Sequence, residues 1–167
     1  TWLRYGRHLA EPRSLELFTG PRILVRRIVG VRLILCPCND TLIADQLLHT
    51  VKPRESSPDC RFLAAVLASR AIAYYFRKRF NRTEKTFPEI RVAELASLPI
   101  PIIDLSSPTD LMRHDRLVQL VEQMLALHQH HSTARTPQEK TALERQIAAT
   151  DAQIDKLVYD LYGLTDA

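Results

Sequence analysis

The chain has 167 residues, of which 46% are hydrophobic and 25% charged, a composition that favours a globular protein with a buried core and excludes a disordered chain. Residues 1–91 carry 17 Lys+Arg against 8 Asp+Glu, a net charge of +9, whereas residues 92–167 carry 6 against 11, a net charge of −5. This asymmetry favours an anionic partner for the first part only, with solvated surface charge as the alternative. No run reaches the roughly 18 apolar residues that a membrane span needs, and no secretory leader is present, so we expect a cytoplasmic protein without a membrane partner.

The first third of the chain predicts a small β domain. Residues 22–29 alternate apolar and polar side chains and are rich in β-branched residues, which is typical of a strand. A second short strand is expected at residues 33–36, followed by a turn at Pro37, Asn39 and Asp40. Residues 42–51 predict one or two further strands.

Helices follow. Residues 60–80 predict one helix with Asp59 as its N-cap, and this helix ends in a basic cluster. Residues 92–98 predict one or two helical turns, which Pro99 and Pro101 end. A piece of loop or extended chain, residues 85–91, lies between them.

The last third predicts two antiparallel helices joined by a short connection near residues 132–135. The first runs from about Asp110 to His131, with a seam of Leu117, Val121, Met124 and His128. The second begins with Thr136 as N-cap, Pro137 at the first helical position and Glu139 completing a capping box. Its heptad seam comprises Leu143, Ile147, Thr150, Ile154, Leu157, Leu161 and Leu164, and Gly163 marks its end.

The expected fold class is therefore α+β: a small mixed or antiparallel β domain with packed helices, then a C-terminal antiparallel two-helix, coiled-coil-like appendage. We predict a first domain of residues 1–103 and a helical hairpin of residues 104–167. The hairpin is either a spacer or a self-association region, and its acidic character argues against contact with DNA. Because the sequence begins at Thr1 with Trp2, Leu3 and Tyr5 following at once, we expect it to be part of a longer protein.

Catalytic motifs are not recognised in this sequence. It has no glycine-rich phosphate loop and no nucleophile elbow, and it contains only 4 glycines. Cys36, Cys38 and Cys60 are expected to be structural thiols, and the His128–His131 cluster a solvated helix end rather than a metal site. Asp151 and Asp155 are expected to form an exposed acidic face rather than an acid–base pair.

Three stretches, in this order, resemble a known family. They are residues 2–28, with Tyr5-Gly6-Arg7 and Gly20-Pro21-Arg22; residues 62–75, with the helix Phe62–Ser69 and Ile72–Tyr75; and residues 85–101, with Phe87-Pro88-Glu89-Ile90-Arg91 and Leu98-Pro99-Ile100-Pro101. The order resembles the TaqI-like C-terminal specificity domain of modification methylases and fused restriction–methylase proteins. Leu157–Leu164 resembles the helix that often closes such a domain. One departure is Leu67-Ala68-Ser69, where many relatives have Leu-Asn-Ser.

The resemblance implies a module that reads a short double-stranded DNA sequence for a type II or IIG-like adenine-specific methyltransferase, and that is not itself an enzyme. The parent's methyltransferase domain would be its partner and would bind S-adenosylmethionine, whereas this chain needs no cofactor or metal. The phosphate contacts predicted from charge and position are Arg26, Arg27, Arg77, Lys78, Arg79, Arg82 and Lys85. Asn39, Asp40, Gln46 and His49 have the side-chain chemistry to read base edges.

Two other classes of protein stay open at this point. The chain could be a specificity subunit of a multi-subunit, type I-like restriction system, which a second recognition domain in the full gene would favour. It could also be a protein-interaction module whose basic surface meets acidic proteins. Salt-sensitive and sequence-selective duplex binding would favour DNA recognition.

Overall fold

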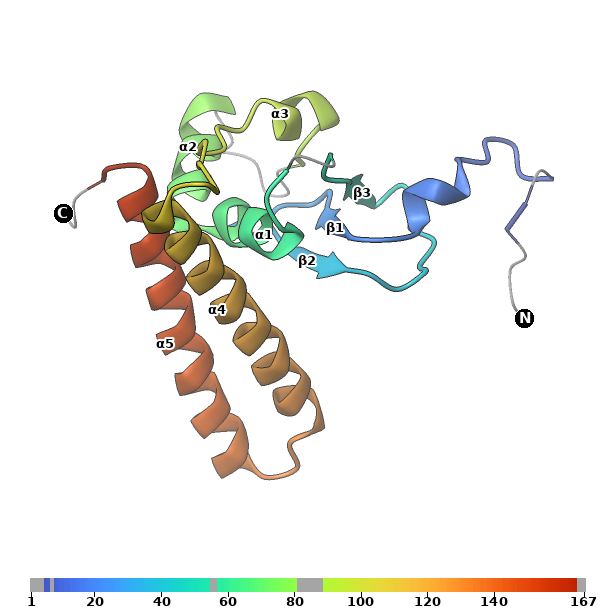
Figure 1. Cartoon of the computed structure of the whole chain (residues 1–167). Coiled ribbons are helices and arrows are strands. Elements are labelled where there is room, and N and C mark those ends of the chain that lie inside the picture. Colours follow the sequence, from blue (N-terminus) through green and yellow to red (C-terminus); the bar gives the residue numbers. More distant parts are fainter. Residues whose placement is uncertain (1–4, 7, 55–56, 81–88, 165–167) are drawn as a thin grey trace.

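In the computed structural model, which describes residues 5–6, 8–54, 57–80 and 89–164, the chain has an α+β fold (Figure 1). A short 3-10 helix, η1 (Leu15–Phe18), precedes three strands, and five helices follow. The strands are β1 (Arg22–Arg26), β2 (Leu35–Cys38) and β3 (Leu48–Val51). The helices are α1 (Cys60–Ala68), α2 (Arg70–Phe80), α3 (Val92–Ala96), α4 (Pro108–Thr133) and α5 (Pro137–Leu161).

The strands form an antiparallel sheet in the order β2-β1-β3, which places β1 at the centre. Ile23 and Val25 of β1 are fully buried on the face that α1 covers, so the alternation seen in the sequence does reflect a half-buried strand. Pro37 corrects one prediction, because it lies inside β2 and not in a turn. The central strand bonds to β2 through its even-numbered residues, as in the 2.8 Å bond from the Arg26 amide to the Ile34 carbonyl. Pro37 therefore sits at a non-bonded position of an edge strand, where the missing N–H is tolerated.

The segment expected to form one helix over residues 60–80 is divided into α1 and α2 by Ser69, whose backbone is extended at ψ 158°. Ser69 is fully buried, and its hydroxyl donates to the Val66 carbonyl at 2.7 Å and accepts from the Ile72 amide at 3.2 Å. The side chain thus ends one helix and caps the next. Serine competes with the helix backbone for hydrogen bonds, which explains why the apolar periodicity alone did not predict the break.

We expect Ser69→Ala to lower the free energy of unfolding by about 1–2 kcal/mol, because it leaves the Ile72 amide at the start of α2 without its cap. Denaturant unfolding followed by circular dichroism measures the change. Ser97→Ala is the matched control, since the Ser97 hydroxyl makes a similar 2.9 Å bond to the Glu94 carbonyl but is exposed. Equal effects of the two substitutions would contradict a capping role for Ser69.

The two long helices α4 and α5 pack against each other, as the sequence predicts. The capping box at the start of α5 is confirmed, with the Glu139 amide 3.2 Å from the Thr136 hydroxyl, and Gly163 ends the helix at φ 63°. The predicted seams were partly wrong. Leu127 of α4 is buried where His128 was expected, fully buried Val158 was not predicted, and Leu164 is half exposed beyond the end of α5.

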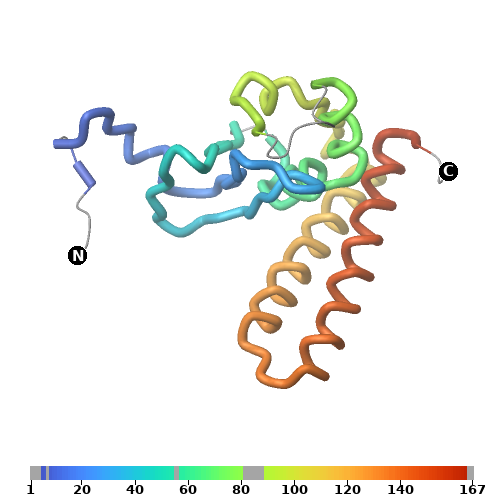
Figure 2. The backbone as a smooth tube through the Cα atoms, turned by 180° about the vertical axis from the view of Figure 1, so that it is seen from behind, coloured from blue at the N-terminus to red at the C-terminus, as the bar shows by residue number. Residues whose placement is uncertain are grey.

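The halves of α4 and α5 nearest the sheet belong to the same hydrophobic core as β1 and α1. This core joins Leu117 of α4 and Val158 of α5 to Phe62 and Ile23, all fully buried. The other halves extend away from the sheet and carry the connecting turn at their far end (Figures 1 and 2). A domain boundary at residue 103 stays a prediction, and it would divide this shared core.

Asp151 and Asp155 correct a further prediction, because they do not form a solvated acidic face. Asp155 is 5% exposed, and its carboxylate lies 3.0 Å from Arg32 Nη2 and 3.0 Å from Arg70 Nε. Its other oxygen accepts from the backbone amide of Arg70 at 2.9 Å, at the positive end of α2. Asp151 also binds the Arg32 guanidinium, at 2.8 Å. These four residues, Arg32, Arg70, Asp151 and Asp155, form an ion cluster that joins α5 to α2 and to the β1–β2 loop.

Candidate nucleic-acid interface

The outer face of α2 carries the basic cluster that the sequence predicts. Ile72, Ala73 and Phe76 turn toward the core, so helical periodicity places Arg70, Tyr74, Arg77 and Lys78 on the other side of the helix. Arg79 falls on the same side as Ile72 and Phe76 but is exposed in the last turn of α2. We call the five residues Arg70, Tyr74, Arg77, Lys78 and Arg79 the α2 surface. With Val31 and Arg32 of the β1–β2 loop, four of these five residues, Arg79 excepted, line an open hollow of about 480 Å³.

Three cations of the α2 surface have no carboxylate partner among the residues that the structure describes. Arg77 donates to the carbonyl of Val31, Lys78 Nζ lies 5.8 Å from the ring centre of Tyr74, and the Arg79 guanidinium lies 5.8 Å from that of Phe80. Tyr74 is 66% exposed, so an aromatic face stands among the charges. Arg82 and Lys85, which the sequence also assigned to phosphate contacts, lie outside the described residues.

Arg26 and Arg27 point to opposite sides of the sheet, as the side chains of adjacent residues in extended chain do. Arg26 ends β1 on the side of the sheet turned away from α1 and is exposed. Arg27 lies on the other side and pairs with Glu89, its Nη2 3.0 Å from the Glu89 carboxylate. Neutralisation by Glu89 leaves Arg26 with the greater capacity to attract an anion.

Two other arginines of residues 1–91 bond within the fold. Arg22 is fully buried and donates to the carbonyls of Gly20, Asp40 and Leu42, at 2.9, 2.5 and 3.3 Å. These bonds fix the β2–β3 loop against the start of β1. Arg32 is likewise bonded in the ion cluster. Part of the positive charge counted in the sequence therefore stabilises the fold.

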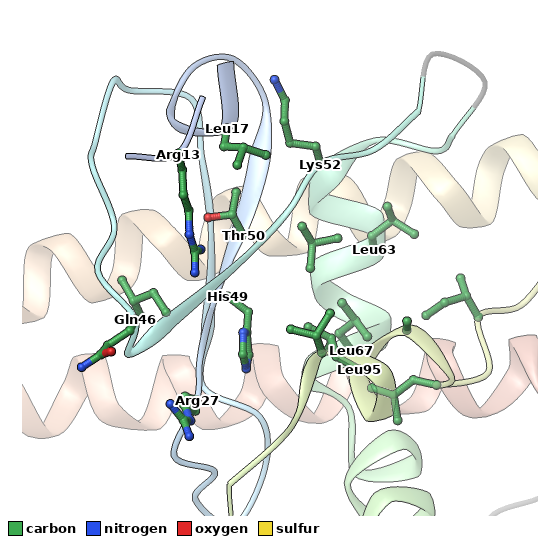
Figure 3. Close-up of a pocket in the computed structure, with 16 residues that line it drawn as sticks. Arg13, Leu17, Arg27, Gln46, His49, Thr50, Lys52, Leu63, Leu67 and Leu95 are labelled. Carbon is green, nitrogen blue, oxygen red and sulfur yellow. The ribbon is translucent and has the colours of Figure 1, made fainter. Parts of the chain in front are cut away.

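A second hollow follows the edge strand β3. It is a cleft of about 600 Å³ between β3 and helices α1 and α3, and we call it the β3 cleft (Figure 3). Leu63, Leu67, Leu95 and Leu98 give it an apolar floor. Arg13 and Lys52 lie toward one end of β3, and Arg27 and Gln46 toward the other.

The β3 cleft brings together three residues that the sequence singled out: Arg27, Gln46 and His49. His49 Nε2 is 2.8 Å from the carbonyl of Ile90, which holds the imidazole at the cleft wall. Asn39 and Asp40 do not line this cleft and are exposed in the β2–β3 loop. Arg13 and Lys52 were missed, because only the packing of η1 beside the end of β3, where Lys52 Nζ donates to the Glu16 carbonyl at 2.7 Å, brings them here.

The histidines and cysteines of the described part of the chain could in principle bind a metal or react as thiolates. No group of three His, Cys, Asp or Glu side chains there could hold a metal ion. His131 faces Glu144 at 3.4 Å, while His128 and His130 are exposed. Partial burial and the neighbouring Cys38 raise the pKa of the Cys36 thiol, which disfavours a reactive thiolate. Among the described helices, none is long and apolar enough to cross a membrane.

The fold and these surfaces define a small α+β module with a polar-rimmed cleft along one sheet edge and, on one helix, cations that have no carboxylate partner among the described residues. The sequence matches the family of TaqI-like C-terminal specificity domains over residues 1–100, and the chain belongs to this family. The family implies DNA target recognition in restriction–modification systems, and a specificity domain is not catalytic in itself. No curated protein matches the chain. The three resembling stretches fall almost entirely within the matched residues, and α4 and α5 follow them.

Proposed function

We propose that this chain is the sequence-reading module of a type II or IIG-like restriction–modification protein that methylates adenine. The observation that carries the DNA contact is the α2 surface, where Arg77, Lys78 and Arg79 lie together without a carboxylate partner among the described residues. Cations grouped at one end of a helix attract phosphates and release counterions on binding. Membership of the specificity-domain family supports DNA as the polyanion.

The phosphate contacts proposed on this surface are Arg77, Lys78 and Arg79, with Arg82 and Lys85 added from the sequence. Arg26 is proposed as a further contact from the open face of the sheet, and Arg27 as a weaker one because Glu89 neutralises it. Base reading is proposed for three exposed polar side chains near the sheet, Asn39, Asp40 and Gln46, and for His49, which is partly buried at the wall of the β3 cleft. Amide and imidazole groups can bond to base edges in the major groove, whereas phosphate contacts only position the module.

The chemistry is proposed to lie in a methyltransferase domain of the parent protein. That domain would bind S-adenosylmethionine and extrude the target adenine from the duplex. The module described here would hold the duplex in register against it.

The helix pair α4–α5 is proposed to be a spacer, and its far half extends away from the sheet as a spacer would (Figure 1). The same projection favours a second candidate function, a specificity subunit of a multi-subunit restriction system. In such a subunit the helices would set the distance to a second recognition domain.

The test is selection of a random duplex pool by the chain at two salt concentrations, followed by sequencing and affinity measurement on the enriched duplex. We expect a short enriched motif. Replacing Arg77, Lys78 and Arg79 together by alanine should weaken binding at least about tenfold and reduce the slope of log affinity against log salt by about 2–3, since each phosphate contact contributes about 0.9 to it.

The matched control replaces Lys140, Arg145 and Lys156 of α5, which are exposed, by alanine and so removes the same charge. This variant should keep both the affinity and the salt slope. Equal losses in the two variants would show that only net charge matters, and no duplex binding at low salt would reject the DNA contact.

A further inference from the structure

The β3 cleft has an open line of backbone hydrogen-bonding groups along one side. The Arg27 amide donates to the Leu47 carbonyl at 2.8 Å, so the odd-numbered residues of β1 bond toward β3. Antiparallel pairing alternates, and Val25 and Ile23 therefore bond to His49 and Val51. The backbone groups of Thr50 point the opposite way, away from β1, and neither has a partner among the described residues.

The floor of the cleft is apolar, and a phosphate backbone has no group that would bind to it. Leu63 and Leu67 of α1 and Leu95 of α3 face the edge strand, and their aliphatic side chains offer no hydrogen bond (Figure 3). At the mouth, Val92 is 67% exposed and Ile100 37% exposed. An apolar cleft rimmed by polar groups suits a ligand that carries apolar side chains as well as polar groups.

Positive charge lies toward one end of the cleft. Arg13 and Lys52 lie toward this end of β3, whereas Arg27, toward the other end, is paired with Glu89. Four strand residues separate the two ends, which corresponds to about 13 Å of extended chain. A segment lying along β3 would therefore place one of its ends beside Arg13 and Lys52 and its central side chains over the leucines.

From these features we propose that the β3 cleft binds an extended polypeptide segment of a partner protein, which pairs with Thr50 as a fourth strand of the sheet. The segment has alternating apolar side chains in its centre and Asp or Glu at the end that lies beside Arg13 and Lys52. Backbone pairing provides the affinity, and the leucine floor and the charged end provide the selection. The site shares no lining residue with the α2 surface, although it is lined by Arg27, Gln46 and His49, which are proposed above as DNA contacts.

Two variants remove the proposed contacts without disturbing the fold. Thr50→Pro deletes the outward amide of an edge strand, a position at which proline is tolerated because that N–H is not used within the sheet. Val92→Asp places a carboxylate at the exposed cleft mouth, in the first turn of α3, where negative charge is favourable for the helix. Val31→Asp is the matched control, since Val31 is 78% exposed in the hollow beside the α2 surface.

The probe is a displayed library of random nine-residue peptides selected against the whole chain. We expect enriched peptides with an alternating apolar centre and an acidic end, which shift the backbone amide resonance of Thr50. Thr50→Pro and Val92→Asp should each weaken the enriched peptide at least tenfold, whereas Val31→Asp should leave it unchanged and weaken duplex DNA instead. No enrichment, or peptides that bind all variants equally, would overturn the proposal. A duplex that shifts the Thr50 amide where peptides do not would assign the cleft to DNA.

Discussion

Replacing Asp155 by asparagine is expected to lower the free energy of unfolding by about 3 kcal/mol. The carboxylate is 5% exposed and accepts from three groups at 2.9–3.0 Å: Arg32 Nη2, Arg70 Nε and the Arg70 amide. Asparagine keeps the volume but removes the charge, and its NH₂ group would face a guanidinium. The expected loss lies at the lower end of the range for a broken buried pair, because the Arg70 side chain is itself 64% exposed.

Chemical denaturation measures this change, and Asp160→Asn is the matched control. Asp160 lies on the same helix, is exposed, and has no side-chain partner among the described residues. Its replacement should change the free energy of unfolding by less than about 0.5 kcal/mol. If the two variants lose the same amount, the ion cluster does not stabilise the contact between α5 and α2.

This ion cluster shows where sequence-based prediction reached its limit. Asp151 and Asp155 are four residues apart on a helix, which is the pattern of a solvated acidic face. Arg32 and Arg70, which neutralise them, are more than 80 residues away in the sequence. No local pattern encodes such a pairing, and the burial of Asp155 depends on how α5 meets the start of α2.

The features predicted well are those set by neighbours in the sequence. The capping box of Thr136 and Glu139, the end at Gly163 and the existence of both long helices depend on residues within one or two turns. The central strand was predicted from alternation, which reflects the two faces of the sheet. The seam position at His128 was wrong because a heptad count drifts along a straight helix, and the α-helical repeat brings Leu127 inward instead.

The candidate interface was predicted in part for the same reason. Lys78 lies opposite the apolar face of its helix, so its exposure could be expected from the sequence, whereas Arg79 continues that face and is exposed at the end of α2. Arg22 has the same chemistry but is buried under the β2–β3 loop, and only the folded chain distinguishes the two kinds of arginine. The approach of Arg13 and Lys52 to the β3 cleft depends likewise on the contact between η1 and the end of β3.

Replacing Leu117 by alanine is expected to lower the free energy of unfolding by about 3–4 kcal/mol, because it leaves a cavity where the side chain is fully buried. Leu117 lies on α4, beyond the predicted boundary at residue 103, yet its core also contains Ile23 and Val25 of β1. Hydrogen exchange of backbone amides measures the loss of stability separately in the sheet and in the helix pair. Since one core joins the two parts, protection should fall equally in β1 and in α5.

Leu125→Ala is the control for this experiment. Leu125 lies on the same helix but is 37% exposed, and its replacement should lower the free energy of unfolding by about 1 kcal/mol or less. If Leu117→Ala reduces protection in α4 and α5 but leaves β1 unchanged, the helix pair unfolds as a separate unit and the boundary at residue 103 is real. Equal loss in both parts would instead mean that the helix pair completes the core of the specificity domain. The projecting half would then be rigidly coupled to the sheet, as a spacer that fixes the position of a second protein domain requires.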